Sequence, residues 1–181
     1  TAGIQHYSNG LLDPTPPPDM VNNPAINTGI AWAFDLWMDN PLVAIPGTRF
    51  DYSSFGYNLA GVVVENALED TYENLIVDNI GNRVGMNTFL ADRFWADIPR
   101  RAVGYTVANR QIAPSGNDDV SWKLPGGGFI SNVVDLARYC GGLMSNILLD
   151  ENTRTGELWA PQPGSPAYGL GLNIGQRDGQ T

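Results

Sequence analysis

The amino-acid sequence predicts an α+β domain in which helices predominate over short strands. Apolar residues recur at helical spacing in several segments, whereas residues 102–108 form a strand-like run that leads into turn residues. The chain has 181 residues, of which 43% are hydrophobic, and this composition is typical of a globular domain with a sizeable core. Because the sequence shows no clear linker or internal repeat, we expect residues 1–181 to belong to one domain.

The first predicted element is a short helix at residues 30–38. Its apolar residues recur at helical spacing, with Asn27 or Thr28 as the cap and Pro41 as the stop. The preceding residues 11–24 contain clustered prolines, which fix φ and remove backbone donors. That stretch is therefore expected to be an irregular surface loop.

Two further helices are predicted after residue 53. The first carries an apolar stripe made of Phe55, Leu59, Val62 and Val63. Its glycines, Gly56 and Gly61, would allow a neighbouring element to approach closely. The second helix covers residues 71–81, with Asn74 at its third position. We expect the first of these helices to anchor the residues before it to the core.

The second half of the chain is predicted to mix loops with two helices. Residues 92–119 lack a sustained period and contain glycines and prolines, so we expect loops and a hairpin there. Asn132 is the expected cap of a helix that ends near residues 142–145, and a last short helix is predicted at residues 151–159. The inner face of the helix after Asn132 is predicted to be Val133, Leu136, Tyr139, Cys140 and Leu143. Cys140, the only cysteine, would then be a small core residue without a disulfide partner in the chain.

Charge and hydropathy argue against several function classes. Nine arginines and one lysine against nineteen acidic residues give a net charge of -9, which repels nucleic acid and anionic bilayers. The sequence has no run of eighteen apolar residues, so no membrane span is predicted. One histidine and one cysteine do not supply zinc ligands at a useful spacing, so no metal site is expected.

Tyr52 is the residue most suggestive of chemistry. The turn at Pro46 and Gly47 delivers it from an extended segment onto the start of the predicted helix. A phenol acts as a base at neutral pH only when cations stabilise its phenolate or share its proton. Otherwise a tyrosine at a helix start is a packed aromatic residue, so the surrounding sequence has to decide between the two interpretations.

The run Tyr-Ser-Ser-Phe-Gly-Tyr at residues 52–57 resembles the tyrosine motif of the serine beta-lactamase and penicillin-binding-protein superfamily, especially its class C, esterase and mitochondrial beta-lactamase-like branches. Three other segments, residues 1–7, 85–88 and 125–139, are similar to motifs of that superfamily in the same order. Residues 168–172 resemble the strand that precedes its last motif. The resemblance spans nearly the whole chain and implies a beta-lactamase/transpeptidase-like fold, of which this chain supplies mainly the helical half.

Two motifs of the superfamily are absent from the 181 residues. Its nucleophile is a serine followed three residues later by a lysine, but the residue three before Lys123, the only lysine, is Val120. The closing Lys-Thr-Gly or His-x-Gly motif is missing as well. We therefore expect residues 1–181 to be one partial domain, an internal portion of a longer hydrolase domain with its nucleophile on an upstream segment.

The resemblance implies a serine hydrolase that acts by acyl transfer through a covalent acyl-enzyme. Its substrate would be an amide, ester or beta-lactam, either a small molecule or a peptide, and no cofactor is implied. Tyr52 would be catalytic, because in the superfamily this tyrosine and the lysine pass the serine proton to the leaving group. The resemblance also favours an extracytoplasmic location, periplasmic or secreted, and leaves the oligomeric state open.

Four other residues match superfamily positions at or near the substrate site: Ser54, His6, Gly127 and Gly128. Ser54 stands where asparagine is commoner, so a helix-capping role is a competing interpretation. His6 would have to serve any Ser-His-Asp triad, but the sequence has no Gly-x-Ser-x-Gly elbow to present a nucleophile. The glycines at residues 126–128 lack a following Lys-Ser or Lys-Thr, so they do not predict a phosphate-binding loop.

A second function class stays open beside the enzyme. A catalytically inactive relative would keep the same scaffold to bind peptides or to self-assemble. An upstream Ser-x-x-Lys would favour the enzyme. Absence of that motif, together with no labelling by a penicillin or fluorophosphonate probe, would favour the scaffold.

Overall fold

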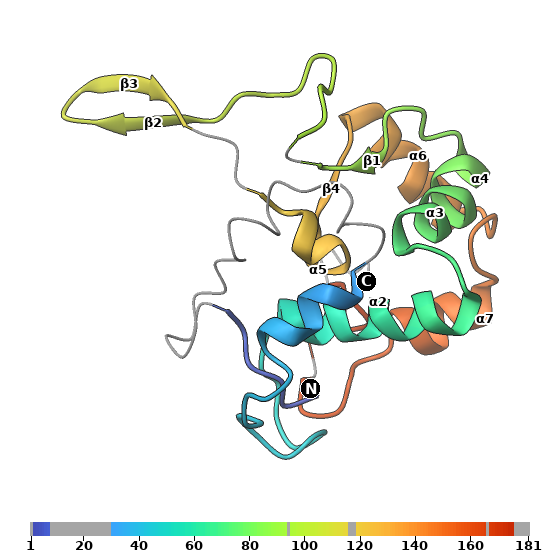
Figure 1. Ribbon diagram of the computed structural model, residues 1–181. Coiled ribbons are helices and arrows are strands. Elements are labelled where there is room, and N and C mark those ends of the chain that lie inside the picture. The colour runs from blue at the N-terminus through green and yellow to red at the C-terminus, as the bar shows by residue number, and fades with distance from the viewer. Residues whose placement is uncertain (1, 8–29, 94, 116–118, 166, 176–181) are drawn as a thin grey trace.

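The computed structural model describes residues 2–7, 30–93, 95–115, 119–165 and 167–175. Within these ranges, helices enclose a small core, and two pairs of short strands lie at separate places (Figure 1). In chain order the elements are η1 (Ala31–Leu36), α2 (Ser54–Leu68), α3 (Tyr72–Ile76), η2 (Val77–Gly81), α4 (Asn82–Val84), β1 (Leu90–Ala91), β2 (Tyr105–Ala108), β3 (Gln111–Pro114), η3 (Ser121–Lys123), α5 (Leu124–Gly127), β4 (Phe129–Ile130), α6 (Val133–Met144), α7 (Glu151–Thr153) and η4 (Arg154–Leu158). The predicted loop at residues 11–24 and the predicted caps Asn27 and Thr28 lie outside the described residues.

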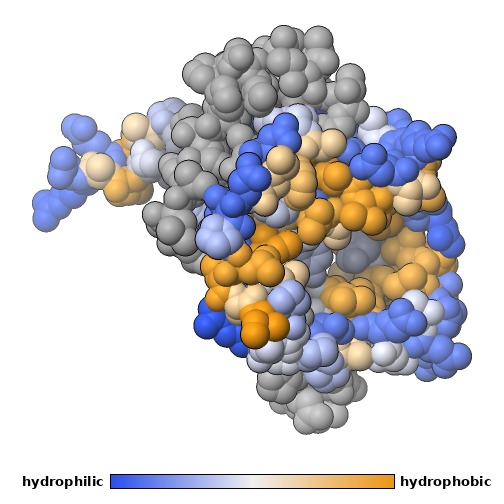
Figure 2. All heavy atoms as spheres, turned by 60° about the horizontal axis from the view of Figure 1, so that its bottom comes forward, coloured by the Kyte–Doolittle hydropathy of each residue, from blue (hydrophilic) through white to orange (hydrophobic). Residues whose placement is uncertain are grey.

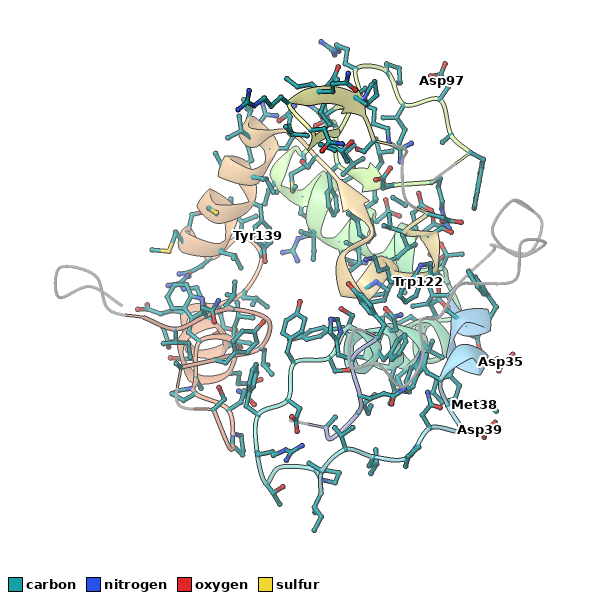
Figure 3. All side chains as sticks on the ribbon, turned by 90° about the vertical axis from the view of Figure 1, so that its left-hand side faces the viewer. Asp35, Met38, Asp39, Asp97, Trp122 and Tyr139 are labelled. Atoms are coloured by element: carbon teal, nitrogen blue, oxygen red, sulfur yellow. The ribbon has the colours of Figure 1, made fainter. Side chains whose placement is uncertain are left out.

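The short helix predicted at residues 30–38 is the 3₁₀ helix η1. Ala33 and Trp37 from this segment form a buried cluster with Phe55 of α2 and Trp122 of η3. The rings of Trp37 and Phe55 are stacked, with their centroids 5.1 Å apart. Figure 3 shows Trp122 inside the molecule near α5. The residues of the η1 region that lie at the outer edge in that view are Asp35, Met38 and Asp39.

Helix α2 begins as the sequence predicts, directly after Tyr52 and its neighbour Ser53. Ser53 is the N-cap, with extended backbone, and its hydroxyl oxygen accepts a hydrogen bond from the N–H of Gly56 at 3.0 Å. The helix ends at Glu69, whose left-handed backbone closes the last turn. The predicted apolar stripe is wrong at Val63, which is exposed because the described residues leave that side of α2 uncovered.

Gly61 brings α2 into close contact with α5, as the sequence predicts. A Cβ atom on Gly61 would come within 2.3 Å of Cγ of Pro125 and within 2.6 Å of Cδ1 of Ile30. These distances are shorter than carbon atoms tolerate, so only glycine allows this separation of the two helices. Gly56 has no such role, since its nearest neighbours are atoms of the Ser53 side chain at 3.6 Å or more.

The helix predicted at residues 71–81 consists of three consecutive elements, α3, η2 and α4. Its start is confirmed, because the hydroxyl oxygen of Thr71 accepts a hydrogen bond from the N–H of Asn74 at 3.2 Å. The middle element η2 is a π-helix, and the segment ends at Gly85 with φ of 75°. Helical periodicity does not distinguish these helix types, which is why the sequence predicts one continuous helix.

Helix α6 begins after the predicted cap, because Oδ1 of Asn132 accepts the N–H of Asp135 at 2.8 Å. The predicted inner face is confirmed at Leu143 and is wrong at Val133, Leu136 and Cys140. Val133 is 78% exposed, Leu136 is exposed, and Cys140 is exposed rather than in the core. The described residues pack against a different side of the helix, and its buried residues are Asp135, Gly142 and Leu143.

The buried Asp135 carboxylate determines which side of α6 faces inward. Its Oδ2 accepts hydrogen bonds from the hydroxyl and the backbone N–H of Thr88, each at 2.7 Å. Oδ1 accepts one from Nη1 of Arg138, also at 2.7 Å. These hydrogen bonds, led by the Thr88 hydroxyl, hold the pKa of Asp135 below its ordinary value although burial acts in the opposite direction. A carboxylate satisfied in this way can replace an apolar residue at the helix contact.

The strands form two antiparallel pairs. β1 pairs with β4, with Leu90 opposite Ile130, and this pair connects the segment after α4 to the segment before α6. β2 pairs with β3 as the hairpin predicted between residues 92 and 119. The last predicted helix is confirmed as α7 and the π-helix η4, capped by Asp150.

The contact at Gly61 leads to a stability prediction. In the full-length protein, Gly61→Ala should lower the free energy of unfolding by about 1–3 kcal/mol, because the added methyl group collides with Pro125 and Ile30. Gly141→Ala is the matched control, since a Cβ there meets nothing within 4 Å, and it should raise the free energy of unfolding by roughly 0.5–1 kcal/mol. Denaturant unfolding of both variants measures the difference, and equal effects would contradict the close contact.

Candidate active site

Tyr52 stands on the surface, immediately before the N-cap of α2. Its side chain is 56% exposed, so it is not sealed in the core. The ring of His6 lies edge-on to it, with the two ring centroids 5.2 Å apart and an interplanar angle of 84°. The structure therefore brings together two predicted site residues that are 46 positions apart in the sequence.

The Ser53 hydroxyl connects the segment at residues 2–7 to the start of α2. It donates a hydrogen bond to the backbone oxygen of Gln5 at 2.7 Å and accepts one from the N–H of Gly56. The backbone N–H of Ser54 donates to Nδ1 of His6 at 3.3 Å. The cap of the helix is thus Ser53, and the competing interpretation of Ser54 as the cap is wrong.

Ser54 is buried beside the triple glycine. A Cβ atom on Gly126 would come within 3.0 Å of Cβ of Ser54. Gly127 has φ of 130°, a conformation that favours glycine, and a Cβ on Gly128 would come within 2.7 Å of the backbone oxygen of Val120. Backbone geometry and packing therefore account for both glycines. Their predicted substrate contact, like that of Ser54, stays a prediction.

His6 is held as a neutral imidazole. Because Nδ1 accepts the Ser54 N–H, the ring proton of the neutral form is on Nε2. Burial, and secondly the positive charge of Lys123, lower the pKa of His6 below its ordinary value. Nε2 is therefore a potential donor beside Tyr52 rather than a permanent cation.

Lys123 lies beside the candidate site residues, and the sequence pattern did not single it out. Its Nζ donates to Oη of Tyr7 at 3.4 Å and lies 5.1 Å from the centroid of the Tyr7 ring and 5.5 Å from that of Trp122. Tyr7 in turn lies 4.0 Å from His6 between ring centroids. Lys123, Tyr7, His6 and Tyr52 thus form a continuous row of side chains. The sequence feature that could have indicated Lys123 is its position: it is the only lysine, it follows Trp122, and it lies shortly before the glycines at residues 126–128.

A groove of about 320 Å³ lies beside Tyr52, between the first turns of α2 on one side and Gln162 and residues 168–170 on the other. Its apolar and aromatic lining includes Phe50, Tyr52, Tyr57, Ala60, Tyr168 and Leu170. In the view of Figure 2, apolar side chains gather around a hollow on the lower face of the molecule. Burial first, then the neighbouring Tyr168 and Tyr52, raise the pKa of the Tyr57 phenol. The Tyr57 phenol therefore stays protonated at neutral pH.

The described residues show neither a cluster of metal-ligating side chains nor a membrane-spanning helix. These residues contain no group of three or more His, Cys, Asp or Glu side chains placed to hold a metal ion. In the same ranges, every helix is too short or too polar to cross a bilayer.

Fold and sequence together define a member of the beta-lactamase family: the chain matches that family over residues 5–181 and belongs to it. The human protein named serine beta-lactamase-like protein LACTB, mitochondrial, is 31% identical over 110 residues, which are 60% of this chain and 20% of the human protein. The chain thus spans about a fifth of the length of this curated relative.

Two solved structures are similar to the chain. A penicillin-binding protein from Bacillus halodurans matches with a TM-score of 0.77 and 25% identity, covering 99% of this chain and 55% of that protein. The octameric penicillin-binding protein homologue from Pyrococcus abyssi matches with a TM-score of 0.60 and 26% identity, covering 84% of this chain and 35% of that protein.

These matches confirm the predicted superfamily and the predicted α+β, beta-lactamase-like fold class. They do not test the roles assigned to individual residues or the prediction that residues 1–181 form one partial domain. The expected extracytoplasmic location also stays a prediction, since the human relative is named a mitochondrial protein.

The contacts of His6 lead to a titration prediction. Its pKa, measured by NMR in the folded protein, should lie below the unfolded value of about 6.5, and Lys123→Met should raise it. Because the folded pKa is the lower one, the contribution of neutral His6 to stability is complete above pH 6.5 and is lost as the pH falls through the folded pKa. Arg110→Met, on the distant hairpin, is the control and should leave the titration unchanged. A folded pKa at or above 6.5 would contradict the half-buried, neutral imidazole.

Proposed function

We propose that the protein is a serine hydrolase that transfers an acyl group through a covalent acyl-enzyme, with Tyr52 as the proton-transferring residue. The observation that carries this proposal is the position of Tyr52: it is exposed, lines an apolar groove and directly precedes the capped start of α2. Membership of the beta-lactamase family supports the reaction class. An amide, an ester or a beta-lactam is the substrate class that this reaction takes.

The proposed chemistry divides between this chain and a segment outside residues 1–181. That segment supplies the serine and a lysine, and the serine oxygen attacks the substrate carbonyl carbon. Tyr52, with its proton shared by the lysine, accepts the serine proton and passes it to the leaving group. Water then attacks the acyl-enzyme, and the free acid leaves.

The described residues have distinct parts in the proposed site. In this proposal Nε2 of neutral His6 donates to a substrate oxygen beside Tyr52. Ser54, Gly127 and Gly128 are the other proposed substrate-binding residues, and they lie outside the lining of the groove. The net charge of -9 disfavours polyanions, so small molecules and peptides are the proposed substrates rather than nucleic acid.

Substitution of Tyr52 tests the catalytic role. In the full-length protein, Tyr52→Phe should leave the free energy of unfolding nearly unchanged, because the exposed hydroxyl has no described hydrogen-bond partner. Turnover of an activated ester should fall by about 10²–10⁴-fold, the usual contribution of a positioned acid or base. Tyr105→Phe removes the hydroxyl of a similarly exposed tyrosine on the distant hairpin and should keep full turnover. Unchanged turnover in Tyr52→Phe would remove the catalytic assignment.

Covalent labelling separates the enzyme from the inactive scaffold. The full-length protein should react with a fluorophosphonate or penicillin probe at one serine, identified by peptide mass spectrometry. Tyr52→Phe should slow that labelling, because the serine loses its proton acceptor. An unlabelled protein that nonetheless binds peptides would instead support the scaffold function.

A further inference from the structure

The β2–β3 hairpin stands away from the rest of the molecule (Figure 1). All eight residues of its two strands are exposed. An isolated two-stranded hairpin is only marginally stable in water, and it gains stability when a further strand or another surface covers it. The hairpin is therefore a candidate interaction surface.

One face of the hairpin is apolar. The register places Val107 opposite Ile112 and Tyr105 opposite Pro114, so these four side chains share a face. Val107 and Ile112 are 73% and 71% exposed. Apolar residues at such exposure, side by side on a projecting element, are unusual for a surface without a partner.

The two edges of the hairpin differ in their capacity to pair. The N–H of Ser115 donates to the oxygen of Gly104 at 2.8 Å, which makes this a hydrogen-bonded pair. By the alternation of antiparallel ladders, Tyr105 and Val107 then direct their N–H and C=O groups outward from β2. On β3 the corresponding residue opposite Tyr105 is Pro114, which has no N–H to offer. The open pairing edge is therefore that of β2.

We propose that β2 pairs antiparallel with β2 of a second copy of the chain, centred on Thr106. In this register Tyr105 of one copy lies opposite Val107 of the other. The outward N–H and C=O groups of both residues then form hydrogen bonds between the copies. We call this contact between the two β2 strands the seam. The two apolar faces join into one face of a four-stranded sheet. The edge is thus complementary to itself, which favours a second copy over an unrelated strand.

The charge distribution is compatible with this pairing. The segment at residues 102–109 has no charged residue, whereas the whole protein has a net charge of -9 that repels a second copy. A contact made by a projecting hairpin keeps the acidic bodies apart. The two copies of Arg110 lie in the turns beyond opposite ends of the seam, and so more than about 14 Å apart, the separation of the two Ala108 residues at about 3.4 Å per residue. That distance exceeds the Debye length of about 8 Å at physiological salt.

Cysteine cross-linking tests the proposed seam. The two copies of Thr106 would form a pair without hydrogen bonds, with Cα atoms about 4.5 Å apart, within the range that a disulfide spans. In the full-length protein with Cys140→Ser, the variant Thr106→Cys should form a covalent dimer under mild oxidation. Ala113→Cys is the matched control. Residue 113 lies on β3 directly opposite Thr106, so both side chains share a face of the sheet. In the proposed dimer the two copies of residue 113 are three strand spacings, or about 14 Å, apart, so this variant should stay monomeric.

Sedimentation of Tyr105→Pro provides a second measurement. Proline at this position removes an outward N–H and so leaves the bonds within the hairpin intact, as native Pro114 does on the other strand. The dimer dissociation constant should rise at least tenfold, while turnover of an activated ester stays at the wild-type value. No cross-link at residue 106, equal cross-linking at residue 113, or capture of a different protein's strand by a monomer would overturn the proposal.

Discussion

The hydroxyl of Ser53 is the contact on which the candidate site depends. It donates to the backbone oxygen of Gln5 and accepts the N–H of Gly56, so one oxygen atom joins the amino-terminal segment to the first turn of α2. His6 directly follows the first of these residues, and Tyr52 directly precedes the serine. The hydrogen bonds of the Ser53 cap therefore set the distance between the His6 imidazole and the Tyr52 phenol.

The rest of the site is placed by the packing of α2. Phe55, in the first turn of the helix, is fully buried and stacks on Trp37, and Trp122 is part of the same cluster. Because Trp122 is in the core, the next residue, Lys123, is held over Tyr7 and within electrostatic reach of His6. The same core that stabilises the helix therefore also places a cation beside the candidate site.

Exposed apolar side chains occur on α6 and on the β2–β3 hairpin. Helical spacing predicted α6, and a strand-like run followed by turn residues predicted the hairpin, but neither pattern says which neighbour covers each face. On α6 the buried side is marked by Asp135, a charged residue whose hydrogen bonds to Thr88 and Arg138 satisfy it. The helical pattern therefore identified α6 as a helix but did not identify the side of it that the described residues bury.

The sequence by itself determined the family, the α+β class, the helix starts at Thr71 and Asn132, and the position of Tyr52 before a helix. These features depend on local chemistry, because caps, turns and motif letters act within a few residues of one another. Only the tertiary structure decided that Ser53 rather than Ser54 is the cap, that Cys140 is exposed, and that Lys123 joins His6. The physical reason is that these outcomes depend on contacts between segments about 50 to 120 residues apart or on which face a helix buries, and no periodicity within one segment encodes them.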